Sequence, residues 1–391
     1  MSDDIEELQA ILRDDPYNFQ ARRTLSIVLL DNGFNQEAKQ NLLYLVRTFP
    51  DNAELLYNLG IAYEKLGEYE KAERAYLRAI VISPETDFYY NLGLTYIEME
   101  EYGKAIVALK HVVEVDSEDS NTYFNLGLCF YNKEEYEVAI EYFQRTIELN
   151  PQDIFAHFYL ANILKTLGQS ELAVGEYQKV IEIAPDYSWA YFNIGSIAYE
   201  EGNFEAALQY LKQTVHYNPH DIQAYMIMVQ IYTTQMRLTE AMDTVQEGLE
   251  NNSKNGDLLY ALSQLYKLNG DNWNYERYIA SSLTNHNTLT LDLEKVKNEY
   301  SKIKVVMDEE RAREEEQRRA EEELLAQQKA EEEADTEEIS DDSEDNDVND
   351  ELSEDDYDEE LDEESGDDEF NEEDDYDDDN IDEDVQEEYS E

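Results

Sequence analysis

The chain has 391 residues and carries 94 Asp and Glu against 29 Lys and Arg, so its formal net charge is -65 at pH 7. A field of this sign repels phosphate backbones and anionic lipid headgroups, which disfavours direct binding of nucleic acids or membranes. Because it has one cysteine, no export signal at its N-terminus and no apolar stretch long enough to span a bilayer, we expect a cytoplasmic protein.

Self-similarity runs through most of the chain, after an N-terminal helical lead-in over residues 1–18. The similar segments follow one another at 34 residues, with one step of 33. Their first residues are Phe19, Ala53, Thr86, Ser120, Ile154, Ser188, Ile222 and Gly256. Self-similarity at such a period is typical of arrays in which each unit packs on its neighbours. We therefore expect eight repeats over residues 19–287.

Small residues recur at fixed places within the repeats. The eighth place holds a small residue such as Gly60, although Val229 is larger, and the twentieth holds alanine in the first seven repeats and Tyr275 in the last. Small side chains let two helices approach closely. Proline ends five repeats, and glycines such as Gly67 stand in mid-repeat, where helices commonly end in the left-handed conformation. The pattern predicts two helices per repeat.

These features resemble the tetratricopeptide repeat family over roughly 270 residues. Strings such as YNLGIAYEKLGEYEKAERAYLRAIVISP and FNLGLCFYNKEEYEVAIEYFQRTIELNP carry the resemblance and align without gaps. It implies an all-α fold, a tetratricopeptide-type α-solenoid in which antiparallel helical hairpins stack into a right-handed superhelix. It also implies that the first helix of each hairpin lines a concave groove.

An apolar stripe follows the last repeat, over residues 288–307. Its members recur at alternating four- and three-residue steps, as one face of a helix requires. They are Leu289, Leu293, Val296, Tyr300, Ile303 and Met307. We expect a capping helix that covers the open end of the solenoid. The alternative is a short homodimeric coiled coil, which a length of under three heptads disfavours, and the sequence leaves the oligomeric state open.

Two charged segments complete the chain. Over residues 308–334, acidic and basic residues stand four apart, as in Glu309 and Arg313, and such pairs stabilise an isolated helix by roughly 0.2–0.5 kcal/mol each. We expect a charged single helix there. Residues 335–391 hold 35 Asp and Glu and no Lys or Arg. This segment also has few aliphatic residues. Burying them cannot offset the entropy that the chain would lose on folding, so we expect a disordered acidic tail.

Asparagine recurs at the sixth place of four repeats. The four residues are Asn58, Asn91, Asn125 and Asn193. The resemblance implies that this place faces the groove, where a side-chain amide can both donate to and accept from the backbone of an extended peptide. Tyr159 interrupts the row in the fifth repeat. The alternative is that these amides bond between helices inside the solenoid.

An apolar row occupies the fifth place, next to the asparagines. It consists of Tyr57, Tyr90, Phe124, Phe158, Phe192, Met226 and Tyr260. Aromatic rings are large, rigid contact surfaces for the apolar residues of a partner. The alternative is that the row only packs the repeats together.

The sequence predicts a protein–protein interaction scaffold that binds an extended peptide segment in the concave groove. It contains no recognisable catalytic motif, so we expect no enzyme and assign no catalytic, cofactor-binding or metal-binding residues. Two alternatives stay open. The acidic tail could make the chain a chaperone for basic proteins, or the solenoid could be the non-catalytic repeat subunit of a glycosyltransferase-type complex.

Overall fold

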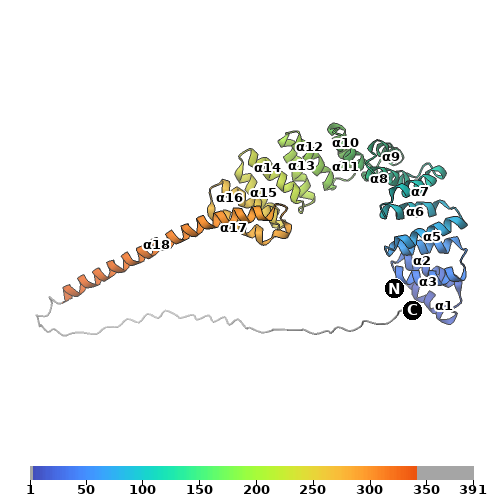
Figure 1. Cartoon of the computed structure of the whole chain (residues 1–391), viewed down its shortest axis with the longest axis horizontal. Helices are drawn as coiled ribbons and strands as arrows, with labels where there is room; N and C mark the ends of the chain where they lie inside the picture. Colours follow the sequence, from blue (N-terminus) through green and yellow to red (C-terminus); the bar gives the residue numbers. More distant parts are fainter. Residues whose placement is uncertain (1–2, 341–391) are drawn as a thin grey trace, which may run out of the picture. The chain divides into compact units, whose positions relative to one another are not determined.

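The computed structural model describes residues 3–340 and shows only helices in this range (Figure 1). The chain divides into two units, Met1–Glu315 and Glu316–Glu391. Residues 335–340 belong to the last helix, and the rest of the predicted acidic tail lies outside the described residues. Within residues 3–340, every helix is too short or too polar to cross a bilayer.

Helices α2 to α17 form eight consecutive hairpins after the lead-in helix α1 (Asp3–Asp14). The first helices are α2 (Phe19–Asp31), α4 (Ala53–Lys65), α6 (Thr86–Glu98), α8 (Ser120–Asn132), α10 (Ile154–Thr166), α12 (Ser188–Glu200), α14 (Ile222–Thr234) and α16 (Gly256–Leu268). The second helices are α3 (Asn35–Thr48), α5 (Tyr69–Ile82), α7 (Tyr102–Val115), α9 (Tyr136–Leu149), α11 (Ser170–Ile183), α13 (Phe204–Tyr217), α15 (Leu238–Asn251) and α17 (Asn272–Thr284). Each first helix begins at the residue where the sequence places the start of its repeat, and the all-α solenoid is confirmed.

Each helix packs on the next one in the chain, and several first helices also contact one another directly. These direct contacts join α2 to α4, α4 to α6, α6 to α8 and α14 to α16. The first helices of repeats 1–4, and those of repeats 7 and 8, therefore lie side by side. We call the side chains at the second, fifth and sixth places of repeats 2–6 the first-helix face.

Small residues at the eighth place make room for large side chains of the second helix. A Cβ atom on Gly60 would lie 2.4 Å from Cε1 of Tyr76, which is fully buried. In the seventh repeat the larger Val229 takes the place of the glycine, and the smaller Val245 takes that of the tyrosine. In the seventh repeat the added volume at one place is thus matched by a smaller side chain at the other, as close packing requires.

The turn inside each hairpin contains one residue in the left-handed backbone conformation. Glycine occupies this place in five repeats, and its φ is +72° at Gly67. The other three repeats hold Glu100, Glu134 and Met236, with φ of 58°, 59° and 58°. A side chain in this conformation costs roughly 1–2 kcal/mol per residue, so these three turns are strained relative to the glycine turns.

Three residues of the apolar stripe after the last repeat are buried, and they pack against α17. A 3₁₀ turn, His286–Thr288, leads into α18 (Leu293–Ser340). Val296, Ile303 and Met307 of α18 form a cluster with Tyr275 and Ile279 of α17. Tyr275 occupies the twentieth place, which holds alanine in the other seven repeats. It packs against α18, whereas each earlier repeat packs against the repeat that follows it.

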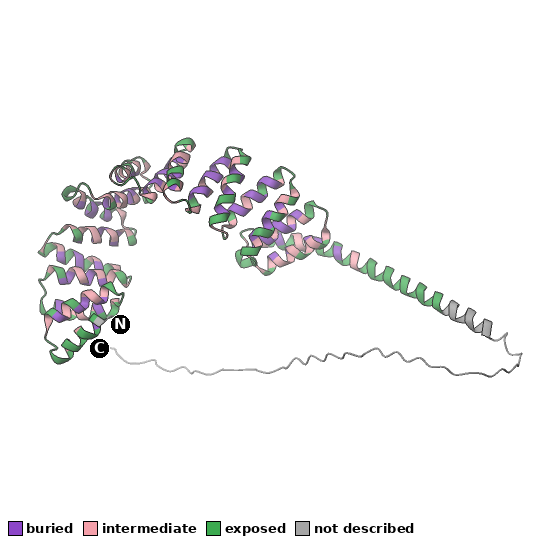
Figure 2. Cartoon of the chain, turned by 180° about the vertical axis from the view of Figure 1, so that it is seen from behind, coloured by how far each residue is buried: buried purple, intermediate pink, exposed green. Residues whose placement is uncertain are grey.

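Helix α18 is continuous across residues 307 and 308, where the sequence suggested separate capping and charged segments. Its docked part ends with Arg311, whose guanidinium donates to both carboxylate oxygens of Glu276 on α17 at 2.8 and 2.9 Å. Residues 312–329 are exposed, and Figure 2 shows the change from buried to exposed along the helix. The expected pair Glu309–Arg313 forms at 3.7 Å.

Candidate functional site

Two predicted site residues in neighbouring repeats are joined by a hydrogen bond. Nδ2 of Asn91 on α6 donates to the hydroxyl oxygen of Tyr57 on α4 at 2.6 Å, and also to the carbonyl oxygen of Asp87 at 3.2 Å. One repeat later, Nδ2 of Asn125 donates to the hydroxyl oxygen of Tyr90 at 3.2 Å. The sixth and fifth places of successive repeats therefore form tyrosine–asparagine pairs across the repeat boundary.

Each pair leaves one donor and one acceptor without a partner among the described residues. The amide oxygens of Asn91 and Asn125 accept no hydrogen bond there, and both residues are half-buried. The hydroxyl hydrogens of Tyr57 and Tyr90 are also unused, because each hydroxyl only accepts in these contacts. A pair can therefore offer an O–H donor and an amide oxygen acceptor to a ligand.

Both tyrosine hydroxyls keep their protons at neutral pH. Burial, together with the negative charge of Asp87, raises the pKa of Tyr57 above its ordinary value. Burial and the negative charge of Asp119 raise the pKa of Tyr90 in the same way. Because a phenol must be protonated to donate, these environments preserve the donor of each pair.

The other two asparagines differ from these pairs. Asn58 is half-buried and makes no hydrogen bond through its side chain within residues 4–329. Asn193 uses both ends of its amide, because Nδ2 donates to the carbonyl oxygen of Trp189 at 2.9 Å and Oδ1 accepts from Nζ of Lys165 at 3.2 Å. The four asparagines therefore share a place in the repeat but not a set of partners.

The fifth-place aromatic residues are all half-buried and pack on the core with part of each ring. Tyr57 stacks on Phe88 at 4.6 Å between ring centroids. Phe158 meets Tyr187 at 5.4 Å and Tyr177 at 5.8 Å, in edge contacts. The aromatic row therefore contributes to packing between repeats, and the part of each ring that is not buried is accessible to solvent.

Tyr159 interrupts the asparagine row because its ring belongs to an aromatic cluster. It stacks on Phe143 at 5.7 Å and meets Tyr131 at 5.2 Å and Phe124 at 5.9 Å in edge contacts. An amide could not fill this space. The fifth repeat thus replaces a hydrogen-bonding group with an apolar ring.

Two exposed aromatic residues on the first-helix face were missed in the sequence analysis. Phe155 is 51% exposed and Trp189 is 55% exposed, and they occupy the second place of adjacent repeats. The ring of Phe155 lies 6.5 Å from that of Phe124, and the ring of Trp189 lies 6.4 Å from that of Phe192. Polar residues at the second place of repeats 2–4 make these two aromatics recognisable in a column-by-column reading of the sequence.

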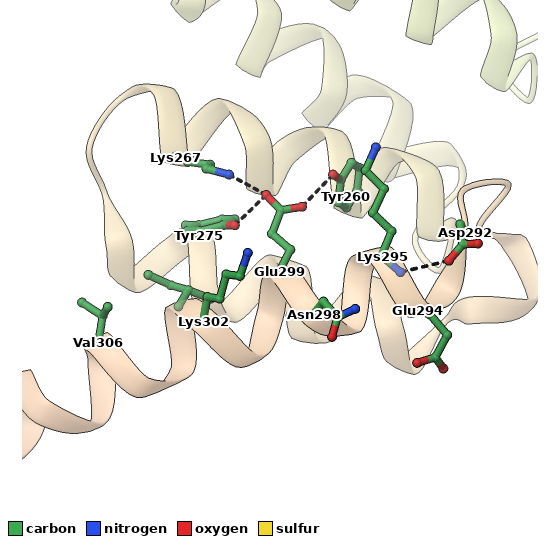
Figure 3. Close-up of a pocket in the computed structure, with 11 residues that line it drawn as sticks. Tyr260, Lys267, Tyr275, Asp292, Glu294, Lys295, Asn298, Glu299, Lys302 and Val306 are labelled. Carbon is green, nitrogen blue, oxygen red and sulfur yellow. Dashed lines mark hydrogen bonds and ion pairs between the residues drawn. The ribbon is translucent and has the colours of Figure 1, made fainter.

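A recess of about 1010 Å³ lies where α18 meets the last repeat (Figure 3). At its centre, Glu299 of α18 accepts hydrogen bonds from Tyr260 at 2.9 Å, Tyr275 at 2.8 Å and Lys267 at 2.5 Å. Burial alone would raise the pKa of Glu299, but these three hydrogen bonds outweigh it and lower the pKa to about 2. The four polar side chains at this centre are hydrogen-bonded to one another. These bonds attach α18 to the last repeat.

Two side chains with reactive groups, Cys129 and His157, are buried. Burial raises the pKa of the Cys129 thiol to about 12, which keeps it protonated and unreactive. His157 is buried and pairs through Nδ1 with Glu176 at 2.6 Å. Among the described residues, His, Cys, Asp and Glu form no group of three or more that could hold a metal ion.

The hairpin array defines an α-solenoid, and comparison with known sequences gives its family. Profiles described as "Tetratricopeptide repeat" match residues 23–86, 86–119, 120–153, 142–175, 176–209 and 198–265. Together they cover residues 23–265 without a gap. The chain belongs to the tetratricopeptide repeat family, whose members are generally non-catalytic scaffolds for protein interactions. No curated protein matches the sequence.

Several solved structures are similar to part of the chain. A crystal structure of MamA is 28% identical and covers 41% of this chain and 95% of its own, with a TM-score of 0.40. MamA 41-end from Desulfovibrio magneticus RS-1 is 26% identical and covers 43% and 96%, with a TM-score of 0.42. YrrB, described as a TPR protein with an unusual peptide-binding site, is 24% identical and covers 47% and 95%, with a TM-score of 0.41.

Proposed function

We propose that the first-helix face binds an extended segment of a partner protein. The tyrosine–asparagine pairs carry the proposal. Tyr57 with Asn91, and Tyr90 with Asn125, each offer one donor and one acceptor, and an extended peptide presents N–H and C=O groups that need both. Because backbone groups are the same in every sequence, these contacts favour an extended conformation more than a particular side chain.

Specificity in this proposal comes from Phe155 and Trp189. Both rings are about half exposed and stand one repeat apart. Buried aromatic anchors dominate the binding energy of many interfaces, and a partner's apolar side chains would cover these rings on binding. Asn193 already uses its amide on Lys165 and on the main-chain carbonyl of Trp189, so the proposal assigns it no direct contact with the peptide.

Membership of the family supports a general role as a scaffold for protein interactions. The acidic-chaperone and glycosyltransferase-subunit alternatives stay predictions. The acidic-chaperone alternative depends on residues outside the described range. The glycosyltransferase-type alternative depends on a second chain. The groove proposal depends on described side chains, and it can be tested with the intact protein.

Peptide selection tests the proposal without knowledge of the natural partner. The intact chain is used to select from a phage-displayed library of random linear peptides, and the affinities of the selected peptides are measured by fluorescence anisotropy. Changing Asn58, Asn91 and Asn125 together to Ala should weaken binding by roughly 10- to 1000-fold, because each lost hydrogen bond contributes about 0.5–1.5 kcal/mol. Phe155→Ala with Trp189→Ala should weaken it by at least a similar factor.

A matched control changes three asparagines at helix ends, Asn32, Asn251 and Asn269, to Ala. These residues are exposed, and affinity should stay at the wild-type value. Circular dichroism verifies that every variant keeps its helix content. Failure to select any peptide, or equal affinities for wild type and the three-asparagine groove variant, would contradict the proposal.

A further inference from the structure

The second helices of the first three repeats are basic, although the chain as a whole is strongly acidic. Helices α3, α5 and α7 each carry one more Lys or Arg than Asp or Glu. By contrast, α9 and α11 each carry two more acidic than basic residues, and α15 carries four acidic residues and no Lys or Arg. Positive charge is therefore concentrated on one stretch of second helices.

A recess of about 490 Å³ lies between α3, α4 and α5. Its apolar lining includes the buried side chains of Val46, Leu56 and Leu59. Its cationic lining residues are Arg47, Lys71, Arg74 and Arg78. No Asp or Glu is among the described residues that line it. The recess therefore combines an apolar floor with a rim of four cations, of which Lys71 pairs with Glu68 of the adjoining turn.

A second recess, of about 640 Å³, lies on the other side of α5, between α5, α6 and α7. Leu77 and Val107 line it and are 41% and 73% exposed. Lys104 and Lys110 line it as well, with Glu114 as the one carboxylate in this lining. We call the surface over the two recesses the basic face, with cations Arg47, Lys71, Arg74, Arg78, Lys104 and Lys110.

Several cations of the basic face have no carboxylate partner within residues 4–329. Arg47 and Arg74 form no ion pair there, and Arg78 donates only to the carbonyl oxygen of Pro50 at 3.2 Å. Further along, the second-helix cations Arg145 and Lys179 are each paired with a carboxylate, at 2.9 and 2.8 Å. The basic face thus retains unpaired guanidinium groups, which match carboxylates in a bidentate geometry.

We propose that the basic face binds the acidic C-terminal segment of this same chain, residues 341–391. This segment has 51 residues, of which 32 are Asp or Glu and none is Lys or Arg. It also contains Tyr357, Phe370, Tyr376 and Tyr389, whose rings suit the apolar floors between the cations. Charge and apolar surface therefore match on both sides.

Covalent attachment favours this occupant over free acidic proteins. An extended segment of 51 residues spans up to about 170 Å, and tethering gives it an effective concentration that separate ligands seldom reach. Bound in this way, the segment would shield the basic face from other acidic partners. This inference does not depend on peptide binding by the first-helix face, which involves the first helices and different residues.

Carbodiimide cross-linking of the intact chain tests the proposal, because the reagent joins an amine directly to a carboxylate in contact with it. The links are mapped by mass spectrometry after cleavage at acidic residues, since the segment contains no Lys or Arg. Dilute protein restricts the reaction to links within one chain. Lys71, Lys104 and Lys110 should link to residues 341–391 at low ionic strength and lose these links at high ionic strength.

Reversing the charge of three arginines distinguishes specific binding at the basic face from general attraction of the acidic segment to positive charge. Arg47→Glu, Arg74→Glu and Arg78→Glu together leave the three reporting lysines intact and should reduce their links to the segment by roughly tenfold. The matched control, Arg145→Glu with Lys179→Glu and Lys212→Glu, makes the same change in charge on α9, α11 and α13 and should leave the links unchanged. Circular dichroism verifies the helix content of both variants.

Two results would overturn the proposal. The first is a spread of links from residues 341–391 over all exposed lysines without preference for the three reporters. The second is an equal loss of links in the arginine variant and in its control, since that would show attraction by net charge alone.

Discussion

The hydroxyl oxygen of Tyr57 lies 2.6 Å from the amide nitrogen of Asn91, and the two residues belong to neighbouring repeats. The contact recurs one repeat later between Tyr90 and Asn125. The asparagines therefore take part in the packing of the solenoid, as one of the sequence-based alternatives states. Because only the nitrogen of each amide is used, this role is compatible with the binding role that we propose for the oxygen.

Tyr57→Phe tests the packing role of the Tyr57–Asn91 hydrogen bond. The ring and its stacking on Phe88 are kept, and the hydrogen bond to Asn91 is lost. We expect the free energy of unfolding to fall by about 0.5–1.5 kcal/mol, measured by urea denaturation followed by circular dichroism. Tyr17→Phe is the control, because Tyr17 is 72% exposed. Equal stability of the two variants would show that the Tyr57–Asn91 bond contributes nothing.

The attachment of the capping helix should depend on pH through Glu299. Its folded pKa of about 2 lies below the ordinary value of 4.5. A carboxyl with a lowered folded pKa adds stability above its unfolded pKa and loses it as the pH falls toward the folded value. We therefore expect stability to decline between about pH 4.5 and pH 2 as Glu299 becomes protonated.

Glu299→Gln should remove this contribution. At neutral pH the free energy of unfolding of the variant should be about 1–3 kcal/mol lower than that of the wild type. Part of the fall in stability at low pH should also disappear. Urea denaturation at several pH values measures both effects. The exposed Glu294 provides the control Glu294→Gln, with a side chain 75% exposed. An unchanged pH profile in Glu299→Gln would contradict the assignment.

The strained turns predict a stabilising substitution. Met236 has a φ of 58° and a side chain that is 74% exposed, so glycine relieves strain without loss of packing. Met236→Gly should raise stability by about 1 kcal/mol, seen as a higher midpoint of thermal unfolding. Gly67→Ala, with φ of +72° in the original residue, should lower the midpoint. A lower midpoint for Met236→Gly would refute the strain argument.

The close contact between Gly60 and Tyr76 predicts a substitution that depends on its partner. A Cβ at position 60 would overlap the ring, so Gly60→Ala should destabilise the protein by about 1–3 kcal/mol. Combining it with Tyr76→Val should recover part of this loss, since the seventh repeat pairs the larger Val229 at the eighth place with Val245 at this one. A double-mutant cycle measures the coupling.

A glycine with free space around it gives the opposite result. A Cβ on Gly175 in α11 would meet no atom within 4 Å, so Gly175→Ala should stabilise the protein by up to about 1 kcal/mol through helix propensity. Additive effects in the Gly60 and Tyr76 cycle, or destabilisation by Gly175→Ala, would show that the glycines are not placed by local volume.

The sequence predicted the hairpin array because its signals are local and repeated. A glycine against a large side chain, an alanine between two helices and a turn after thirteen residues each restrict the chain in the same way in every repeat. The helix after the last repeat has a related signal, since burial of one helix face imposes its own period on the sequence. Its continuity into the charged segment has no such signal, because no residue around position 307 marks either an end or a continuation.

The sequence predicted which positions of the repeat form the candidate site, but not which contacts the side chains at those positions make. Asn91 and Asn193 have the same place in the repeat, yet one bonds to Tyr57 and the other to Lys165. The difference arises from the neighbours of each amide in the adjacent repeat. Exposure of Phe155 likewise depends on how far the next first helix covers it.

The sequence by itself determined the family, the number of repeats and the start of every first helix, because steric rules between residues close in the chain repeat every 34 residues. Only the tertiary structure decided which side chains meet across repeat boundaries, which turns are strained and which cations lack a carboxylate. These properties depend on distances between residues about 30 or more positions apart. The relative placement of stacked hairpins sets those distances, and the one-dimensional pattern does not contain it.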